Sequence, residues 1–305
     1  MGYGDYSRDA HAAIMTERAA APVQKVFVQK SCHALMNPLH LGQRESRDSA
    51  EHPNSLGIVF ALDVTGSMGR VPETMAKEML PTFMKILEAC QVADPQLLFM
   101  AVGDALKDRA PLQVGQFEST AQLMDQWLTW SYLEGEGGGN GHESYELALY
   151  TLARHTKLDC WEKRGKKGYV FLTGDELPFP SLSKDIARKV LGDRLEEDLT
   201  VEEVIAELRE TFVPFFIIPT RARRERCEPR WRELLGEHVL CTNNVQDVCY
   251  VSAGALCLVE GLVPDLDALT LLFKSMGLEY GDLNSVVGAL RPLAKSLGRG
   301  GTSSG

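Results

Sequence analysis

The chain has 305 residues, of which 44% are hydrophobic and 24% charged, so its composition is that of a globular protein and not of a disordered one. Its formal net charge of −10 argues against a protein that binds nucleic acid through clustered positive charge. We therefore expect no nucleic-acid partner, and a basic or metal-bridged partner suits the chain better.

Neither a membrane segment nor a disulfide framework is expected. The N-terminal segment has acidic and basic residues where a secretory signal needs an uninterrupted apolar core, and no later stretch reaches about 18 apolar residues. The seven cysteines are scattered without CxxC spacing, which indicates reduced core residues. We expect a cytoplasmic protein that does not contact a membrane.

Residues 1–54 are interpreted as an N-terminal extension packed on the domain, because Pro38, Gly42 and the polar run 44–53 are typical of irregular structure. From Leu56 the pattern changes to apolar runs, which are typical of strands buried on both faces of a parallel sheet. The runs cover residues 56–62, 97–102, 169–172, 213–218 and, more weakly, 239–241.

Segments with helical periodicity separate these runs, so the chain is predicted to be an α/β protein with a doubly wound, mostly parallel sheet and helices on both faces. Residues 111–117 follow the second run too closely for a helix and could form an antiparallel edge strand. The best-marked helix starts at Thr200, where Thr200 and Glu203 form a capping-box pattern. Other helical patterns cover residues 75–90, 245–260 and 264–276, the last two of which would close the sheet.

We predict one main domain over residues 55–262, with a helical insertion near 182–198. Residues 263–305 are predicted to form a C-terminal helical extension and a flexible tail.

The candidate chemistry follows the first strand, in the loop from Asp63 to Gly69. In a doubly wound sheet, ligands bind at the carboxyl ends of the strands. Asp63, Thr65 and Ser67 stand at alternate positions, so one carboxylate and two hydroxyls can turn toward one point. Oxygen ligands suit Mg²⁺, although the same residues are also common in a helix cap and turn.

This loop resembles the D-x-[ST]-x-S signature of the metal-ion-dependent adhesion site of von Willebrand factor A (VWA) domains. The segment 173–176, Thr-Gly-Asp-Glu, resembles the family's L-[ST]-D-G loop, whose aspartate holds the metal. Here the glycine precedes Asp175 instead of following it, so Glu176 remains a substitute.

A third segment completes the resemblance in the order that the family requires. The glycine-rich run 137–144 resembles the loop of bacterial VWA proteins in which an acidic residue follows the glycines. This points to Glu143 as the ligand, with Asn140 and Ser144 as alternatives, while His142 is expected at the surface.

The resemblance implies Mg²⁺, with Mn²⁺ or Ca²⁺ as alternatives, bound directly by Thr65 and Ser67. Asp63, Glu143 and Asp175 would bind the ion directly or through water. One open coordination position would take an Asp or Glu of a protein partner, which makes the chain a binding module with no catalytic residues. Residues 61–68 and 161–165 also resemble intracellular bacterial VWA proteins found with MoxR-type AAA+ ATPases, which implies an adaptor in such a multi-protein system.

Two other functions stay open: a metal-free scaffold with the same fold, and a metal-dependent hydrolase such as a phosphatase with Asp63 as nucleophile. Against the phosphatase, Thr65 stands where D-x-D enzymes have their second carboxylate. Asp104 is expected to be a turn residue. The arginines that follow the fifth apolar run are expected to form a solvated face more readily than a docking patch; they are Arg221, Arg223, Arg224 and Arg226.

Overall fold

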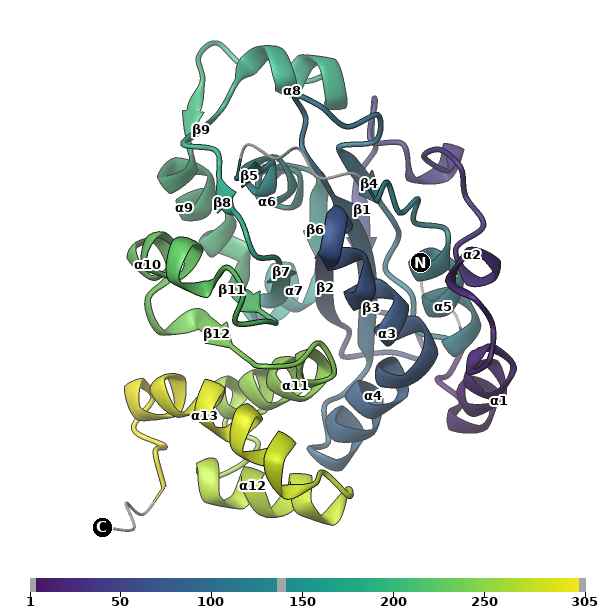
Figure 1. Ribbon diagram of the computed structural model, residues 1–305, viewed down its shortest axis with the longest axis vertical. Helices are drawn as coiled ribbons and strands as arrows, with labels where there is room; N and C mark the ends of the chain where they lie inside the picture. The colour runs from purple at the N-terminus through teal and green to yellow at the C-terminus, as the bar shows by residue number, and fades with distance from the viewer. Residues whose placement is uncertain (1–3, 136–140, 302–305) are drawn as a thin grey trace.

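A six-stranded sheet lies at the centre of the computed structural model, which describes residues 4–135 and 141–301 (Figure 1). The strand order is β12-β11-β7-β2-β3-β4, and all neighbours are parallel except β4, which pairs antiparallel with β3. The strands are β2 (Leu56–Asp63), β3 (Pro95–Val102), β4 (Leu112–Val114), β7 (Gly168–Thr173), β11 (Phe212–Ile218) and β12 (Val239–Cys241). The predicted fold class is therefore confirmed, including the antiparallel edge strand.

Continuous apolar runs form the central strands because both faces of the sheet are covered. Every residue of β2 is buried, and Phe60 at its middle pairs in register with Phe99 of β3 and Phe171 of β7. The ring of Phe60 lies 5.8 Å and 5.6 Å from those of its two neighbours, and 4.9 Å from the ring of Phe83, which comes from a covering helix. A strand buried on one face only would alternate apolar and polar residues instead.

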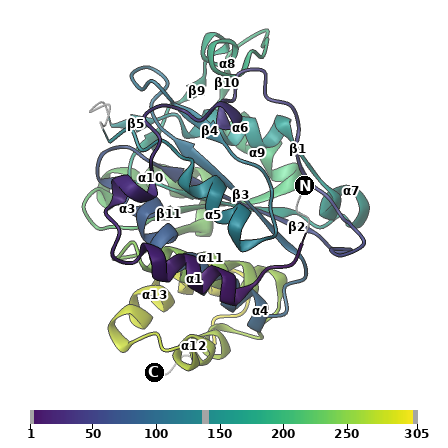
Figure 2. The same cartoon turned by 90° about the vertical axis from the view of Figure 1, so that its right-hand side faces the viewer.

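One face of the sheet is covered by α4 (Leu80–Ala89) and α11 (Asp247–Glu260), which pack against each other (Figure 2). A short helix and a π-helical turn lead into α4; they are α3 (Arg70–Thr74) and η3 (Met75–Met79).

Two further helices, α12 (Leu266–Ser275) and α13 (Tyr280–Ser296), form an outer layer on this face. Gly254 of α11 allows the close packing, because a methyl group there would lie 2.7 Å from Leu290 of α13. The expectation that residues 264–276 close the sheet is wrong, since α12 packs mainly against α13.

The other face is covered by α6 (Tyr145–His155), α9 (Val201–Thr211) and α10 (Arg224–Leu235). The predicted capping box at the start of α9 is present, with Thr200 and Glu203 bonded reciprocally. Between β7 and α9 lies α8 (Lys184–Leu191), whose flanking segments pair as the short strands β9 (Ser181–Leu182) and β10 (Leu199–Thr200). This pairing closes the base of the helical insertion.

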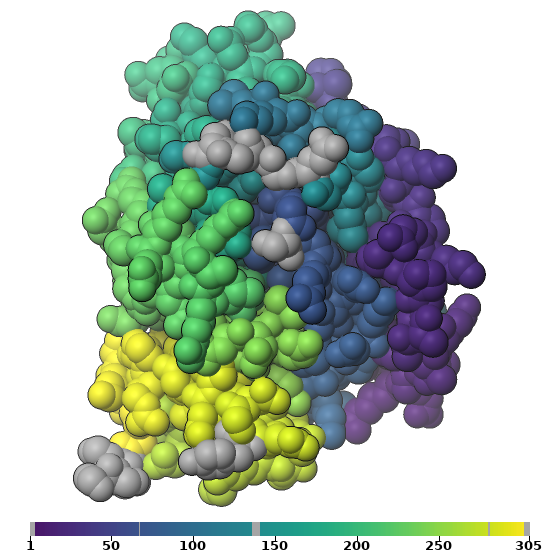
Figure 3. Space-filling model, viewed as in Figure 1, coloured from purple at the N-terminus to yellow at the C-terminus, as the bar shows by residue number. Residues whose placement is uncertain are grey.

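The N-terminal segment runs along one side of the molecule, shown in purple in Figure 3. It contains α1 (Arg8–Arg18), α2 (Val23–Val26), η1 (Ala34–Met36) and β1 (Arg44–Ser46). α1 packs against α5 (Ala121–Thr129), where Arg18 pairs with Asp125. The run at 44–53 was expected to be irregular, but its first residues form β1, which pairs in parallel with β6 (Thr156–Leu158).

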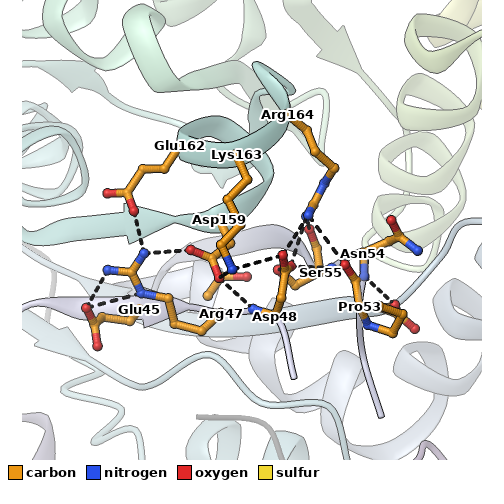
Figure 4. A network of polar contacts seen from close by, with 12 residues as sticks. Glu45, Arg47, Asp48, Pro53, Asn54, Ser55, Asp159, Glu162, Lys163 and Arg164 are labelled. Carbon is orange, nitrogen blue, oxygen red and sulfur yellow. Dashed lines mark hydrogen bonds and ion pairs between the residues drawn. The ribbon is translucent and has the colours of Figure 1, made fainter. Parts of the chain in front are cut away.

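Next to β1, a polar network joins the N-terminal segment to α7 (Asp159–Arg164) (Figure 4). Asp159 accepts hydrogen bonds from Arg47 Nη1 at 2.7 Å and from the backbone of Asp48 at 2.8 Å. Asp48 in turn pairs with Arg164 at 2.7 Å. Because the Asp159 side chain is only 5% exposed, these charges are screened less by solvent than a typical surface pair.

All seven cysteines are free thiols, and five of them are buried. Across the described ranges, every helix falls short of the length or apolar character that crossing a bilayer requires.

Candidate metal site

The strand order reverses between β2 and β7, and the candidate residues lie at this point. β2 is followed along the chain by β3 on one side, whereas β7 is followed by β11 on the other, which leaves a crevice beyond their carboxyl ends. Because these strands are parallel, Asp63, which ends β2, lies on the same edge of the sheet as Asp104 and Asp175, which come soon after β3 and β7.

Asp63 is the last residue of β2 and is completely buried. Its Oδ1 accepts hydrogen bonds from the backbone N–H of Thr65 at 2.9 Å and from the Thr65 hydroxyl at 2.6 Å, which fixes the turn into η2 (Gly66–Gly69). Gly66 has a φ of +44°, a left-handed conformation that favours glycine. The turn thus places Asp63 and Thr65, two of the three residues that were expected to converge, against each other.

Glu143 reaches the same point from the second loop. It belongs to β5 (His142–Glu143), which pairs with β8 (Leu177–Pro178) just after β7 and so joins the second loop to the third. The hydroxyl of Thr65 lies 3.1 Å from Glu143 Oε1 and can donate to it. Since a hydroxyl carries one proton, the same group serves either Asp63 or Glu143 at one time.

The second oxygen of Glu143, Oε2, is buried and accepts no hydrogen bond from any described residue. Burial raises the pKa of Glu143 to about 9, with the Asp63 charge as the second cause. Burial likewise raises the pKa of Asp63 to about 6 against its hydrogen bonds, which lower it. Two carboxyl groups therefore share a buried site in which the described residues offer fewer hydrogen-bond donors than the two groups can accept.

The alternatives to Glu143 have different positions. Ser144 points to the loop after β3, where its Oγ accepts from the backbone of Ala105 at 2.9 Å and its N–H donates to Gly103 at 3.0 Å. Asn140 lies outside the described residues, as does the side chain of Ser67. The expected roles of Asn140 and Ser67 therefore stay predictions.

Tyr145, the first residue of α6, is a site residue that the sequence analysis missed. Its hydroxyl donates to Asp63 Oδ2 at 2.6 Å, and its fully buried ring packs edge-on against Phe216 and Trp231, both at 5.6 Å. A methyl group at position 174 would overlap this hydroxyl and lie 2.6 Å from Cζ of the same ring. The tyrosine occupies the space that a side chain at position 174 would need, so only glycine fits before Asp175. The departure of this glycine from the family's L-[ST]-D-G order was the feature of the sequence that pointed to a bulky neighbour.

Asp175 and Glu176 follow β7 and are nearly buried, with side chains 4% and 8% exposed. Arg223 pairs with Glu176, and its Nη1 lies 3.7 Å from Asp175 Oδ1. Arg226 Nη1 lies 3.6 Å from Glu176 Oε2. Burial raises the pKa of Asp175, and Arg223 offsets part of that effect.

The four arginines therefore divide into two pairs. Arg223 and Arg226 contact the loop after β7, which the expectation of a solvated face did not anticipate. Arg221 bonds to Asn243, and Arg224 to the backbone of Thr242. Asp104 is a turn residue as expected, since its Oδ1 accepts from the backbone of Leu106 at 2.8 Å.

The donor set fits a hard divalent cation. Within residues 4–135 and 141–301, no three Asp, Glu, His or Cys side chains form a group that could hold a metal ion by themselves. An ion here would need hydroxyl and water oxygens as well, and Mg²⁺ commonly keeps several waters beside one or two carboxylates. Oε2 of Glu143, which has no hydrogen-bond partner in the part of the chain that the structure describes, is the atom that such an ion would satisfy.

Neither a family model nor a curated protein matches the sequence. Among solved structures, the chain is similar to the pilus adhesin SpaC of Lactobacillus rhamnosus GG in its open conformation, with 9% identity, a TM-score of 0.48, and coverage of 72% of this chain and 31% of that one. It is also similar to a von Willebrand factor type A protein from Catenulispora acidiphila, with 15% identity, a TM-score of 0.43, and coverage of 74% and 48%.

A third similar structure is proximal thread matrix protein 1 of the mussel byssus, described with a zinc-occupied MIDAS motif, with 13% identity, a TM-score of 0.41, and coverage of 70% and 50%. The chain spans about a third to a half of the length of these three structures. Its fold is defined by its own strand order and pairing.

Proposed function

We propose that the chain is a VWA-type binding module that holds a divalent cation among its three loops and, through the cation, an acidic side chain of a protein partner. The observation that carries the proposal is the buried Oε2 of Glu143, which accepts no hydrogen bond from the described residues and lies in a site shared with Asp63 and Thr65. A buried carboxylate oxygen without a partner costs free energy, and a bound cation removes that cost.

The cation that we propose is Mg²⁺, with Mn²⁺ or Ca²⁺ as alternatives. Glu143 and the hydroxyls of Thr65 and Ser67 would hold it, and Asp63 and Asp175 would contribute directly or through water. The Oδ1 atom of Asp63 already accepts two hydrogen bonds and Oδ2 only one, so the capacity that remains on Asp63 lies on Oδ2. The ion would be the largest local charge and would attract a carboxylate.

The geometry around Asp63 supports binding over hydrolysis. A nucleophilic aspartate must reach its substrate, but Asp63 is completely buried and accepts three hydrogen bonds. A phosphatase that uses this residue would have to break them.

Two finer parts of the proposal rest on the sequence resemblance alone. The partner belongs to a bacterial multi-protein system with a MoxR-type AAA+ ATPase, and the protein works in the cytoplasm. Affinity capture from native bacterial lysate in Mg²⁺ and then in EDTA tests the first part, and detection of the protein in fractionated cells tests the second. Recovery of an ATPase subunit that EDTA releases supports the first part, and recovery of only metal-independent proteins contradicts it.

The metal site itself is tested by thermal melting of wild type and Glu143→Gln in millimolar Mg²⁺ and in EDTA. Gln keeps the shape of the side chain but removes the charge, so we expect Mg²⁺ to raise the melting temperature of wild type and to raise that of the variant less. Glu202→Gln is the matched control, since Glu202 is an exposed residue of α9 that pairs with Arg230 and is not a candidate ligand. Equal responses of wild type and Glu143→Gln would refute the site.

A further inference from the structure

We propose that Arg223 and Arg226 form a second contact point for the partner, so that the module prefers a segment with two nearby acidic side chains over one with a single acidic side chain. This inference rests on the proposed function, because the first acidic side chain is the one bound through the cation. Arg223 and Arg226 together are called the arginine pair.

The arginine pair lies at the start of α10, beside the loop after β7. Arg223 contacts both Asp175 and Glu176, and Arg226 contacts Glu176. A methyl group at Gly141 would overlap the guanidinium of Arg226, so this group lies directly over the backbone two residues before Glu143. Arg223 therefore contacts the candidate ligand Asp175 directly, and Arg226 lies beside the backbone that leads to Glu143.

The arginine pair is open to solvent, although the two carboxylates that it contacts are nearly buried. The side chains of Arg223 and Arg226 are 47% and 50% exposed, against 4% and 8% for Asp175 and Glu176. Both arginines contact these carboxylates through Nη1. A guanidinium has five N–H donors in a planar fork, so Nε of both arginines and Nη2 of Arg223 still have donors for a second carboxylate from outside, whereas Nη2 of Arg226 packs over Gly141.

The net charge of the site explains why the arginine pair matters for an acidic partner. Four acidic side chains follow strand ends or loops at this edge of the sheet: Asp63 and Glu143, which share the hydroxyl of Thr65, and Asp175 and Glu176 in the loop after β7. When all are ionised, a divalent cation leaves a net charge of about −2, which would repel an acidic segment. The two arginines bring that net charge to about zero, and their exposed sides then attract the second carboxylate, while the cation takes the first.

Loss of the arginine pair should therefore have effects of opposite sign on the binding of metal and on the binding of peptide. Removing both positive charges should strengthen binding of the cation, because like charges nearby oppose it. The same change should weaken binding of the acidic segment. A variant that merely damages the fold would weaken both.

The probes are two fluorescein-labelled peptides of glycine and serine, one with a single Glu and one with two Glu residues separated by two positions. Binding is followed by fluorescence anisotropy in Mg²⁺ and in EDTA, with wild type and Arg223→Gln/Arg226→Gln. We expect wild type in Mg²⁺ to bind the two-Glu peptide at least tenfold more tightly, and the double variant to bind both peptides about equally. The melting temperature of the double variant should still rise with Mg²⁺, by at least as much as that of wild type.

Two further variants make the result specific. Arg221→Gln removes the same charge from a neighbour that bonds to Asn243 and should keep the preference for two Glu residues. Arg223→Lys/Arg226→Lys keeps both charges without the planar fork and should retain part of the preference.

The outcomes separate this inference from the proposed function. If wild type binds both peptides equally and only in Mg²⁺, the binding module stands and the role of the arginine pair is refuted. If the double variant keeps the tenfold preference, the arginine pair is likewise refuted. If neither peptide binds wild type in Mg²⁺ and Mg²⁺ does not raise its melting temperature, the proposed function fails and the inference fails with it.

Discussion

Replacing Gly174 by Ala should destabilise the protein by displacing Tyr145. The added methyl group would lie 2.6 Å from Cζ of that ring and would overlap its hydroxyl, which donates to Asp63. The ring has little room to retreat, because it is fully buried against Phe216 and Trp231.

Two terms set the size of the effect. Overpacking a dense core costs about 1–3 kcal/mol, and losing a hydrogen bond to a charged acceptor costs about 1.5–3 kcal/mol. We expect the free energy of unfolding to fall by about 3–5 kcal/mol, a large part of the roughly 5–15 kcal/mol that stabilises a typical domain.

The assay is urea unfolding in EDTA, followed by tryptophan fluorescence, with Gly288→Ala as the matched control. Gly288 is an exposed residue within α13 with no atom near the added methyl group, so that substitution should raise the free energy of unfolding by about 1 kcal/mol. Tyr145→Phe removes only the hydroxyl, and it should cost less in the Gly174→Ala background than in wild type because the hydrogen bond is already lost. A Gly174→Ala protein that unfolds at the wild-type urea concentration would refute the reasoning.

Three other changes have effects that follow from single contacts. Burial lowers the pKa of His11 to about 4, with Arg18 as a second cause, so the unfolded chain binds a proton first as pH falls. Between pH 6.5 and 4, the free energy of unfolding of wild type should therefore fall by up to about 3 kcal/mol more than that of His11→Gln, as measured by urea unfolding at each pH. Parallel pH profiles of the two proteins would contradict this. Asp159→Asn should lower the free energy of unfolding by about 1.5–3 kcal/mol and speed proteolysis of residues 44–55, since Arg47 and Lys163 lose their shared negative charge and one of the two acceptor oxygens becomes an NH₂ group. An unchanged cleavage rate would show that the network does not anchor this segment. Thr65→Val keeps the side-chain shape but removes the hydroxyl between Asp63 and Glu143, so the rise in melting temperature with Mg²⁺ should shrink; a wild-type rise would exclude Thr65 as a ligand.

The strands and their order could be predicted because local pattern and general connection rules determine them. The run at residues 56–62 is apolar at nearly every position, which is typical of a central parallel strand, and right-handed crossovers then restrict the order of the others. The same logic placed Asp63 and Asp175 on one edge of the sheet. The short spacing after β3 also identified β4 as an edge strand.

Contacts between distant residues could not be predicted in this way. Tyr145 begins an amphipathic helix, and its ring fits the apolar positions of that helix like any core residue. Its bond to Asp63, 82 positions earlier, leaves no mark in the neighbouring sequence. Arg223 and Arg226 belong to a basic run that is normally solvated, and their carboxylate partners stand 47 or more positions earlier in the chain. β1 has three residues, too few to show alternation, and its partner β6 lies more than 100 residues away.

The attachment of the N-terminal segment has a consequence for the order in which the chain folds during synthesis. Arg18 can pair only after Asp125 has been synthesised, 107 residues later, and Arg47 only after Asp159, 112 residues later. At about 5–20 residues per second, a ribosome needs roughly 5–20 seconds to make the intervening chain. The segment that is made before the sheet therefore docks after much of the sheet exists, and a nascent chain stopped before Asp159 should leave residues 44–55 open to protease.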